Sequence, residues 1–132
     1  MSFEAIRKSI EGRMATWGQY PVEYDGHATP PPVAAAQAAK TPWVRLTIQS
    51  GDSFVAGIGS GPCVSRTGLV FLQIFTKPNT GTAEANRVAD SLVEHFQTWQ
   101  DGPLETQAMS MQRVGEQDGY WQTNLQAPFR YD

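Results

Sequence analysis

The sequence predicts an α+β domain in which a single, mostly antiparallel sheet has two helices packed on one side. Three observations predict this class. Residues 69–75 form a nearly continuous apolar run, which is typical of a strand covered on both faces. Residues 120–131 alternate between apolar and polar side chains, as a half-buried strand does. Residues 3–17 and 84–96 carry apolar side chains at spacings of three and four, the pattern of an amphipathic helix.

The amino-terminal segment is predicted to form the first helix and an edge strand. Ser2 is a suitable residue to cap this helix, and Gly18 is suited to end it. The short segment 22–24 then fits a strand at the edge of the sheet, because Asp25 and Gly26 favour a turn directly after it.

Residues 27–42, with the sequence HATPPPVAAAQAAKTP, are rich in proline and alanine. The consecutive Pro30, Pro31 and Pro32 favour an extended polyproline conformation, and the alanines offer little apolar bulk to anchor the segment. We therefore expect a long Pro/Ala-rich loop here. Two interpretations stay open: a passive mobile loop, or an arm that becomes ordered when a neighbouring subunit docks.

The middle of the chain is predicted to form strands that lead into the central strand of the sheet. Residues 43–49 alternate cleanly and predict a half-buried strand. Gly51 and Asp52 are expected to turn the chain, and 53–56 to form a brief strand. The glycine-rich residues 57–62 predict a loose connection before the apolar run.

The carboxyl-terminal part is predicted to form a hairpin. Residues 107–114 are expected to pair with 120–131 around a five-residue loop at 115–119. Pro128 lacks a ladder donor and suggests that the end of the last strand lies at an edge. The polar side of this strand carries Gln122, Asn124, Gln126 and Arg130.

Size and composition predict one domain spanning residues 1–132 and a role in protein–protein contact. The net charge is −3 and only 17% of the residues are charged, so the basic surface of a nucleic-acid-binding protein is not expected. A neutral polar surface is also easier to desolvate against a partner. The beginning of the chain lacks the apolar block of a signal peptide, and no window resembles a membrane span. A single cysteine favours a reducing compartment, so we expect the cytoplasm or an assembly made there.

The chemically active residue types predict no catalytic, cofactor or metal site, and we therefore expect no enzyme. The glycines of 57–61 are followed by Pro62 and strand-forming residues, whereas a phosphate loop leads into a helix. Cys63 would need His27 or His95 as a base to act as a nucleophile, and nothing in the sequence pairs them. No carboxylate accompanies the histidines at a spacing typical of metal ligands.

Two stretches resemble a known family. Residues 66–81, RTGLVFLQIFTKPNTG, continued by 89–92 in the second helix, resemble the middle of small tail terminator (tail completion) proteins of long-tailed bacteriophages. Residues 119–131, GYWQTNLQAPFRY, resemble the last strand of these proteins. The leading helix and the strand at 43–49 agree in order and spacing, so the resemblance spans most of the chain.

The resemblance implies a structural virion protein. Such a protein forms a homo-oligomeric ring, expected to be a hexamer, that caps the head-proximal end of the tail tube, ends tube polymerisation and offers a surface to head-completion or neck proteins. DNA would only pass through its lumen, no membrane is involved, and the ring would be assembled in the host cytoplasm. The residues expected at contacts are Pro30, Pro31, Pro32 and Lys40, then Gly57, Gly59 and Gly61, and, for a lateral surface, Gln122, Asn124, Gln126 and Arg130.

Three other functions fit the same residues. The first is a neck or head-completion subunit, which would share the size and oligomeric habit of a tail terminator. The second is a small ligand-binding or enzymatic α+β domain with a cleft under the Pro/Ala-rich segment; Cys63 beside a histidine would favour it. The third is an adaptor that binds a peptide along an exposed strand edge.

Overall fold

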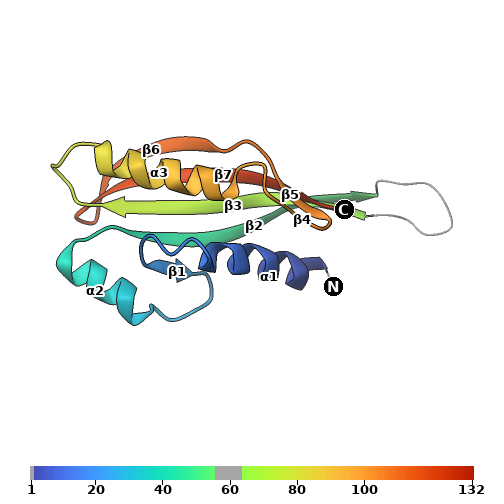
Figure 1. Cartoon of the computed structure of the whole chain (residues 1–132), viewed down its shortest axis with the longest axis horizontal. Coiled ribbons are helices and arrows are strands. Elements are labelled where there is room, and N and C mark those ends of the chain that lie inside the picture. The colour runs from blue at the N-terminus through green and yellow to red at the C-terminus, as the bar shows by residue number, and fades with distance from the viewer. Residues whose placement is uncertain (1, 56–63) are drawn as a thin grey trace.

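The computed structural model describes residues 2–55 and 64–132 (Figure 1). The helices of this described part are α1 (Ser2–Ala15), α2 (Pro31–Ala39) and α3 (Ala83–Phe96). Its strands are β1 (Val22–Tyr24), β2 (Trp43–Val55), β3 (Val64–Thr76), β4 (Gln100–Asp101), β5 (Leu104–Thr106), β6 (Ser110–Gln117) and β7 (Tyr120–Tyr131). The α+β class is therefore confirmed. Across the described residues, no helix is long and apolar enough to span a bilayer.

The strands form one sheet in the order β1-β2-β3-β7-β5-β4, and β6 also pairs with β7. Only β1 and β2 are parallel among the paired strands that the structure describes. The apolar run lies in β3, which pairs with β2 on one side and β7 on the other. The prediction of a mostly antiparallel sheet with this run at its centre is thus confirmed.

Pro128 does not lie at a sheet edge, contrary to the sequence prediction. β3 pairs with β7 along one side, while β6 and then β5 follow each other along the opposite side, on residues 120–126 and 129–131 of β7. Pro128 falls in the interval between these two partners, and its carbonyl accepts a hydrogen bond from the Gln107 N–H over 2.8 Å. The missing N–H of proline is tolerated where the partner strand changes.

The main apolar cluster lies between the sheet and the helices α1 and α3. Both helices contribute the side chains that recur at three- and four-residue spacings, as predicted. Trp17 Nε1 donates a hydrogen bond to Ser91 Oγ over 2.9 Å, which ties the segment after α1 to α3. The buried members are Ile6, Ile10, Met14, Trp17, Val44, Leu46, Val70, Leu72, Ile74, Val88, Ala89, Leu92, Phe96, Leu104, Leu125, Ala127 and Phe129.

Residues 31–39 form a helix, so the expectation of a long Pro/Ala-rich loop is wrong. Pro30 is the extended residue before the helix, and prolines occupy its first two positions, where the backbone N–H has no partner within the helix anyway. The following alanines are the strongest helix formers. Lys40 ends the helix in the left-handed conformation, with a φ of 58°, and its N–H bonds to the Ala36 carbonyl.

The helix α2 belongs to a second, smaller cluster on the other face of the sheet. Val33 and Ala36 pack with Trp43, Phe75 and Tyr120. Because successive side chains of a strand point to opposite faces, Trp43 points away from its neighbour Val44 of the main cluster. α2 is thus a third helix that the sequence prediction did not include, and it packs with this separate cluster and not with α1 and α3.

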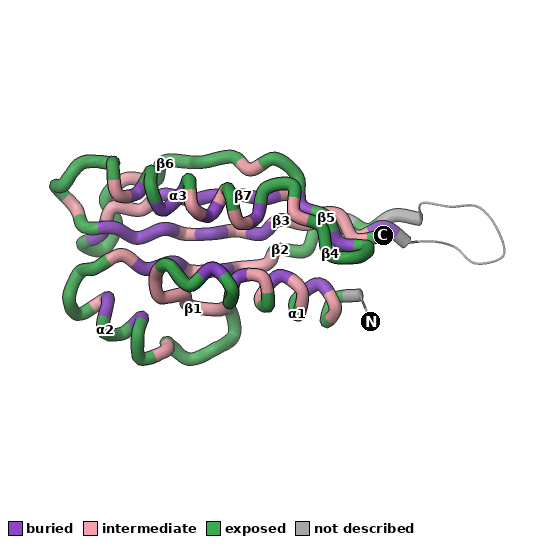
Figure 2. Tube along the Cα trace, viewed as in Figure 1, coloured by how far each residue is buried: buried purple, intermediate pink, exposed green. Residues whose placement is uncertain are grey.

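Two turns also differ from the sequence prediction. Gly51 and Asp52 lie within β2, where a register shift between Ser50 and Ser53 marks a bulge in a continuous strand. The last hairpin turns at Asp118 and Gly119, which both have positive φ, of 51° and 80°. Because Gln117 already pairs with Tyr120, the connection has two residues, as in a type I′ turn, and not five. Figure 2 shows that residues 65–76 of β3 and all of β7 are buried or half-buried, whereas β6 is largely exposed.

Candidate functional site

The face of the sheet opposite the main cluster carries mostly uncharged polar side chains. Four residues predicted to make contacts lie there at alternate positions of β7, namely Gln122, Asn124, Gln126 and Arg130. The side-chain amide of Gln122 donates to Asn124 Oδ1 over 3.0 Å, and that of Gln126 donates to Gln112 Oε1 of β6 over 3.3 Å. The amides thus satisfy one another within the sheet. Burying such a face against a partner costs less than burying unpaired charges.

Arg130 is held beside a carboxylate at one end of this polar face. Its Nε donates to Asp132 Oδ1 over 3.0 Å, and the hydroxyl of the buried Ser65 donates to the same oxygen. The hydrogen bond from Ser65, followed by that from Arg130, holds the pKa of Asp132 below its ordinary value. The guanidinium charge is therefore matched locally and does not stand alone on the face.

A hollow of about 320 Å³ lies where α2 meets this face. It brings together two of the predicted contact residues, Lys40 and Gln122. The Lys40 ammonium lies 4.6 Å from the ring centre of Tyr120, and the Arg45 guanidinium lies 5.2 Å from that of Trp43. Both cations thus lie over aromatic rings. The hollow is lined by Gln37, Lys40, Trp43, Arg45, Gln73, Phe75, Gln117, Asp118, Tyr120 and Gln122.

The remaining predicted contact residues are dispersed or outside the described part of the chain. Pro30, Pro31 and Pro32 lie at the beginning of α2, whereas Lys40 lies at its end. Gly57, Gly59 and Gly61 fall within residues 56–63, outside the described residues, as does Cys63.

The two histidines make structural contacts. His95 Nε2 lies 2.6 Å from the Arg13 carbonyl oxygen and 3.0 Å from Thr16 Oγ1, so its ring joins α3 to the end of α1. The His27 ring packs edge-on against Tyr24, with 6.3 Å between the ring centres. Across residues 2–55 and 64–132, no group of three or more histidine, cysteine and acidic side chains could hold a metal ion.

Sequence reasoning missed the open edges of the sheet. β1 pairs with β2 only at residues 44–46, so within the described residues the outer side of 47–55 has no strand partner. At the opposite edge, β6 pairs with β7 alone. Unpaired N–H and C=O groups along an edge are a ready template for another strand. An alternating pattern predicts a strand but not which strands will be its neighbours, so the sequence carried no signal for these edges.

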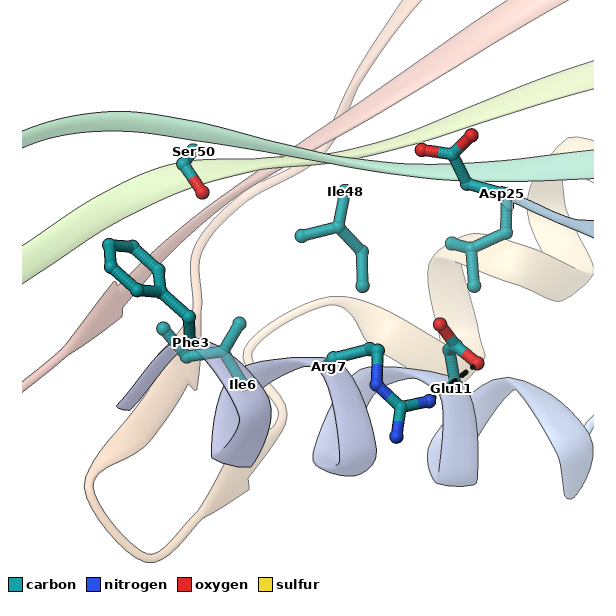
Figure 3. A pocket seen from close by; sticks show the side chains of 8 residues that line it. Phe3, Ile6, Arg7, Glu11, Asp25, Ile48 and Ser50 are labelled. Atoms are coloured by element: carbon teal, nitrogen blue, oxygen red, sulfur yellow. Dashed lines mark hydrogen bonds and ion pairs between the residues drawn. The ribbon is translucent and has the colours of Figure 1, made fainter. Parts of the chain in front are cut away.

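The large hydrophobic side chains that are most exposed in the described structure lie at these two edges. Met111 and Val114 on β6 are 53% and 39% exposed, and Phe3 on α1 is 57% exposed. Phe3 borders a groove of about 220 Å³ between α1 and the outer part of β2, together with Ile48 and Ser50 (Figure 3). Met111 and Val114 therefore lie on an open edge strand, whereas Phe3 lies on α1 beside the outer part of β2, with the Arg66 guanidinium 4.3 Å from its ring centre.

The charged residues of this groove are largely paired along α1. The Arg7 guanidinium bonds to Glu4 and, over 3.3 Å, to Glu11. The hydrogen bond from Arg7 is the main cause of a lowered pKa at Glu4. The Arg7 charge is therefore matched by the two glutamates of α1, and Asp25 adds a further carboxylate to the lining of the groove.

Comparisons with known proteins identify the fold and the family of the chain. No curated protein matches the chain. Among the solved structures that match, one has 19% sequence identity and a TM-score of 0.73, with 100% of this chain and 96% of that chain covered. At this identity, the likeness shows a shared fold. A family model described as phage tail terminator protein matches residues 5–126. The chain therefore belongs to the phage tail terminator family, a family of structural proteins of the phage tail.

Proposed function

We propose that copies of this chain form a ring that caps the head-proximal end of the tail tube. The ring ends tube polymerisation and offers the surface to which head-completion or neck proteins join. The observation that carries the proposal is the family match over residues 5–126. A hexamer is the ring size that the resemblance to tail terminators implies.

The distribution of open surface supports a ring. A closed ring of identical copies needs two different surfaces on each copy that fit each other, because a head-to-tail contact is what repeats around an axis. Within the described residues, unpaired strand segments lie at both sides of the sheet, and two of them, the outer part of β2 and β6, differ from each other. Each copy can therefore contact one neighbour at each edge.

The polar face of β7 is a further candidate for lateral contact between copies, and the end that carries α2 supplies surface for the tube and neck proteins. Gln122, Asn124 and Gln126 form a face whose amides are already hydrogen-bonded. We assign axial contacts to the segment from Pro30 to Lys40. The net charge of −3 suits a lumen through which DNA passes without adhering. The assembled protein lies at the head-proximal end of the virion tail, after assembly in the host cytoplasm.

Deletion of the gene from the phage genome tests the capping function. We expect electron micrographs of the lysate to show overlong tails or tails without heads, because nothing would end tube growth or prepare the tube for joining. Supplying the gene from a plasmid should restore tails of normal length. Tails of normal length on infectious particles after the deletion would contradict the proposal.

Labelling separates this function from that of a neck subunit. Isolated tails from a phage that makes no heads should bind a gold-labelled antibody against the protein at one end. Label found on filled heads but not on such tails would instead assign the protein to the head-completion or neck proteins.

A further inference from the structure

β6 and the outer part of β2 run in opposite directions. Each has an exposed apolar side chain near it, on the side of the sheet that the helices α1 and α3 cover. We infer that β6 of one copy adds, antiparallel, to the outer part of β2 of the next copy, with Met111 against Phe3. This inference rests on the proposed ring and identifies the contact that would build it.

The strand directions fit this contact. β2 is antiparallel to β3, β3 to β7, and β7 to β6, so β6 runs opposite to β2 within one copy. A second copy that keeps its helices on the same side of the sheet therefore presents its β6 antiparallel to β2. The antiparallel ladder of the sheet would continue across the boundary between copies.

The side chains also lie on the same side. Met111 is opposite Leu125 in the β6–β7 register, and Leu125 belongs to the main cluster beneath α1 and α3. Phe3 lies on α1 and borders the groove on that same side. When two sheets join with their helices on one side, Met111 of one copy approaches Phe3 of the next. Each apolar side chain then loses contact with water, which is the main favourable term in association.

The available length fits as well, provided that the copies are staggered. β6 has 8 residues, about 27 Å of extended chain, and the outer part of β2 at residues 47–55 is long enough to receive it. β1 already pairs with residues 44–46 of β2. Within one copy, β6 lies level with this occupied part of β2, because it pairs with residues 120–126 of β7. The next copy must therefore be displaced along the strand direction. A stagger of this kind tilts strands relative to the axis, as closure of any sheet into a barrel requires.

Lysine and proline, which often protect an edge strand, are absent from the outer part of β2 and from β6, while β6 carries the charged residues Arg113 and Glu116. Each contains one bulge, between Ser50 and Ser53 in β2 and between Arg113 and Gly115 in β6. A bulge bends and twists its strand, and the residues on either side of it keep their N–H and C=O groups.

Cysteine cross-linking of the purified chain tests the contact. The variant carries Phe3→Cys and Met111→Cys, together with Cys63→Ser, which removes the chain's own cysteine. A short bismaleimide should convert it into a ladder of covalent oligomers that ends at the ring size, because each copy offers one cysteine to each neighbour. The matched single-cysteine variants should remain monomers on a denaturing gel.

A charge at the same position provides a second measurement. Met111→Asp would place a carboxylate against Phe3, and we expect it to weaken self-association by roughly tenfold or more in sedimentation experiments. Arg87→Glu, on the exposed side of α3, is the control and should leave association unchanged. At concentrations where the parent is monomeric, both variants should unfold at the same urea concentration as the parent within error.

The outcomes separate this inference from the proposed function. Three results would overturn the edge contact and leave the capping function standing. They are an oligomer of ring size without a cross-linked ladder, dimers from either single-cysteine variant, and a Met111→Asp protein that associates normally. A chain that stays monomeric at all concentrations would also overturn it. The gene-deletion experiment would then still decide the capping function independently.

Discussion

The two faces of the sheet differ in what they contribute. The face under α1 and α3 is aliphatic and aromatic, and its central side chains Val70, Leu72 and Ile74 are fully buried. The opposite face is a lattice of amides, with a small aromatic cluster where α2 covers one end. Burial of apolar side chains stabilises the first face by about 1.5–3 kcal/mol for each large residue. The first face therefore maintains the fold, and we propose that the other face and the open edges contact other molecules.

Strand β3 shows the difference within a single element. Leu69 and Phe71 belong to the same apolar run as Leu72 but lie half-buried on the polar face. The following predictions use matched substitutions on the two faces, from the largest expected effect to the smallest.

Leu72→Ala should destabilise the fold far more than Leu69→Ala. Both residues are leucines of one strand, but Leu72 is 0% exposed within the main cluster. Its truncation leaves a cavity that typically costs about 2–5 kcal/mol, whereas truncation of the half-exposed Leu69 should cost about 1 kcal/mol or less. Urea unfolding followed by circular dichroism measures both. Equal losses would show that the polar face is also part of the core.

Ala35→Pro should disrupt α2, whereas Pro31→Ala should be tolerated. A proline in the interior of α2 removes a backbone hydrogen bond and clashes with the preceding turn, at a cost of about 3 kcal/mol. Pro31 is at the first helical position, where alanine is acceptable. Amide exchange of residues 33–40 provides the measurement. If Ala35→Pro left their protection unchanged, the helical assignment of this segment would be wrong.

Thr106→Val should destabilise the fold by about 1–3 kcal/mol, because it removes two hydrogen bonds of a buried hydroxyl, each typically worth about 0.5–1.5 kcal/mol. The Thr106 hydroxyl donates to the Phe96 carbonyl and accepts from the Trp99 N–H over 2.9 Å, which fastens the end of α3 to β5. Thr47→Val, at a half-buried position on the polar face, is the matched control and should have little effect. Thermal unfolding of the two variants measures the difference in stability. Equal unfolding temperatures for the two variants would contradict the prediction.

The smallest effect concerns pH at the edge of the polar face. The hydrogen bonds from Ser65 and Arg130 lower the pKa of Asp132 from 3.8, so the folded state binds this proton less readily than the unfolded state. The stabilisation is complete above about pH 4 and is lost as the pH falls through the lowered pKa. Asp132→Asn should therefore be slightly less stable than the parent at pH 6, with the difference vanishing at pH 2. A difference that grew towards low pH would reverse the sign of this linkage.

Sequence periodicity predicted the elements that bury a continuous apolar stripe. The helices around Ile10 and Leu92, the central strand and the alternation of β7 all follow from the spacing of apolar residues, because burial in the main cluster imposes that spacing. The family resemblance was also confirmed by the match over residues 5–126.

Features that depend on distant partners could not be predicted in this way. α2 is anchored by Trp43, Phe75 and Tyr120, which come from three different strands, so its own small side chains gave no signal. The hollow lined by Lys40 and Gln122 could not be predicted either, because it forms only where α2 packs against the sheet. The open edges depend on where β1 and β6 end, and strand ends are set by tertiary pairing rather than by local pattern. The Asp118–Gly119 turn, in contrast, carried a recognisable signal, since Asp-Gly favours two-residue hairpins.

Electron microscopy of the purified chain tests the central claim, that identical copies associate head-to-tail into a closed structure. We predict class averages of a ring with one size and rotational symmetry, together with a native mass that is a whole multiple of the 14.5 kDa chain, six copies being the expected number. A species of 14.5 kDa at every concentration, or a two-fold symmetric dimer that grows no further, would contradict the account.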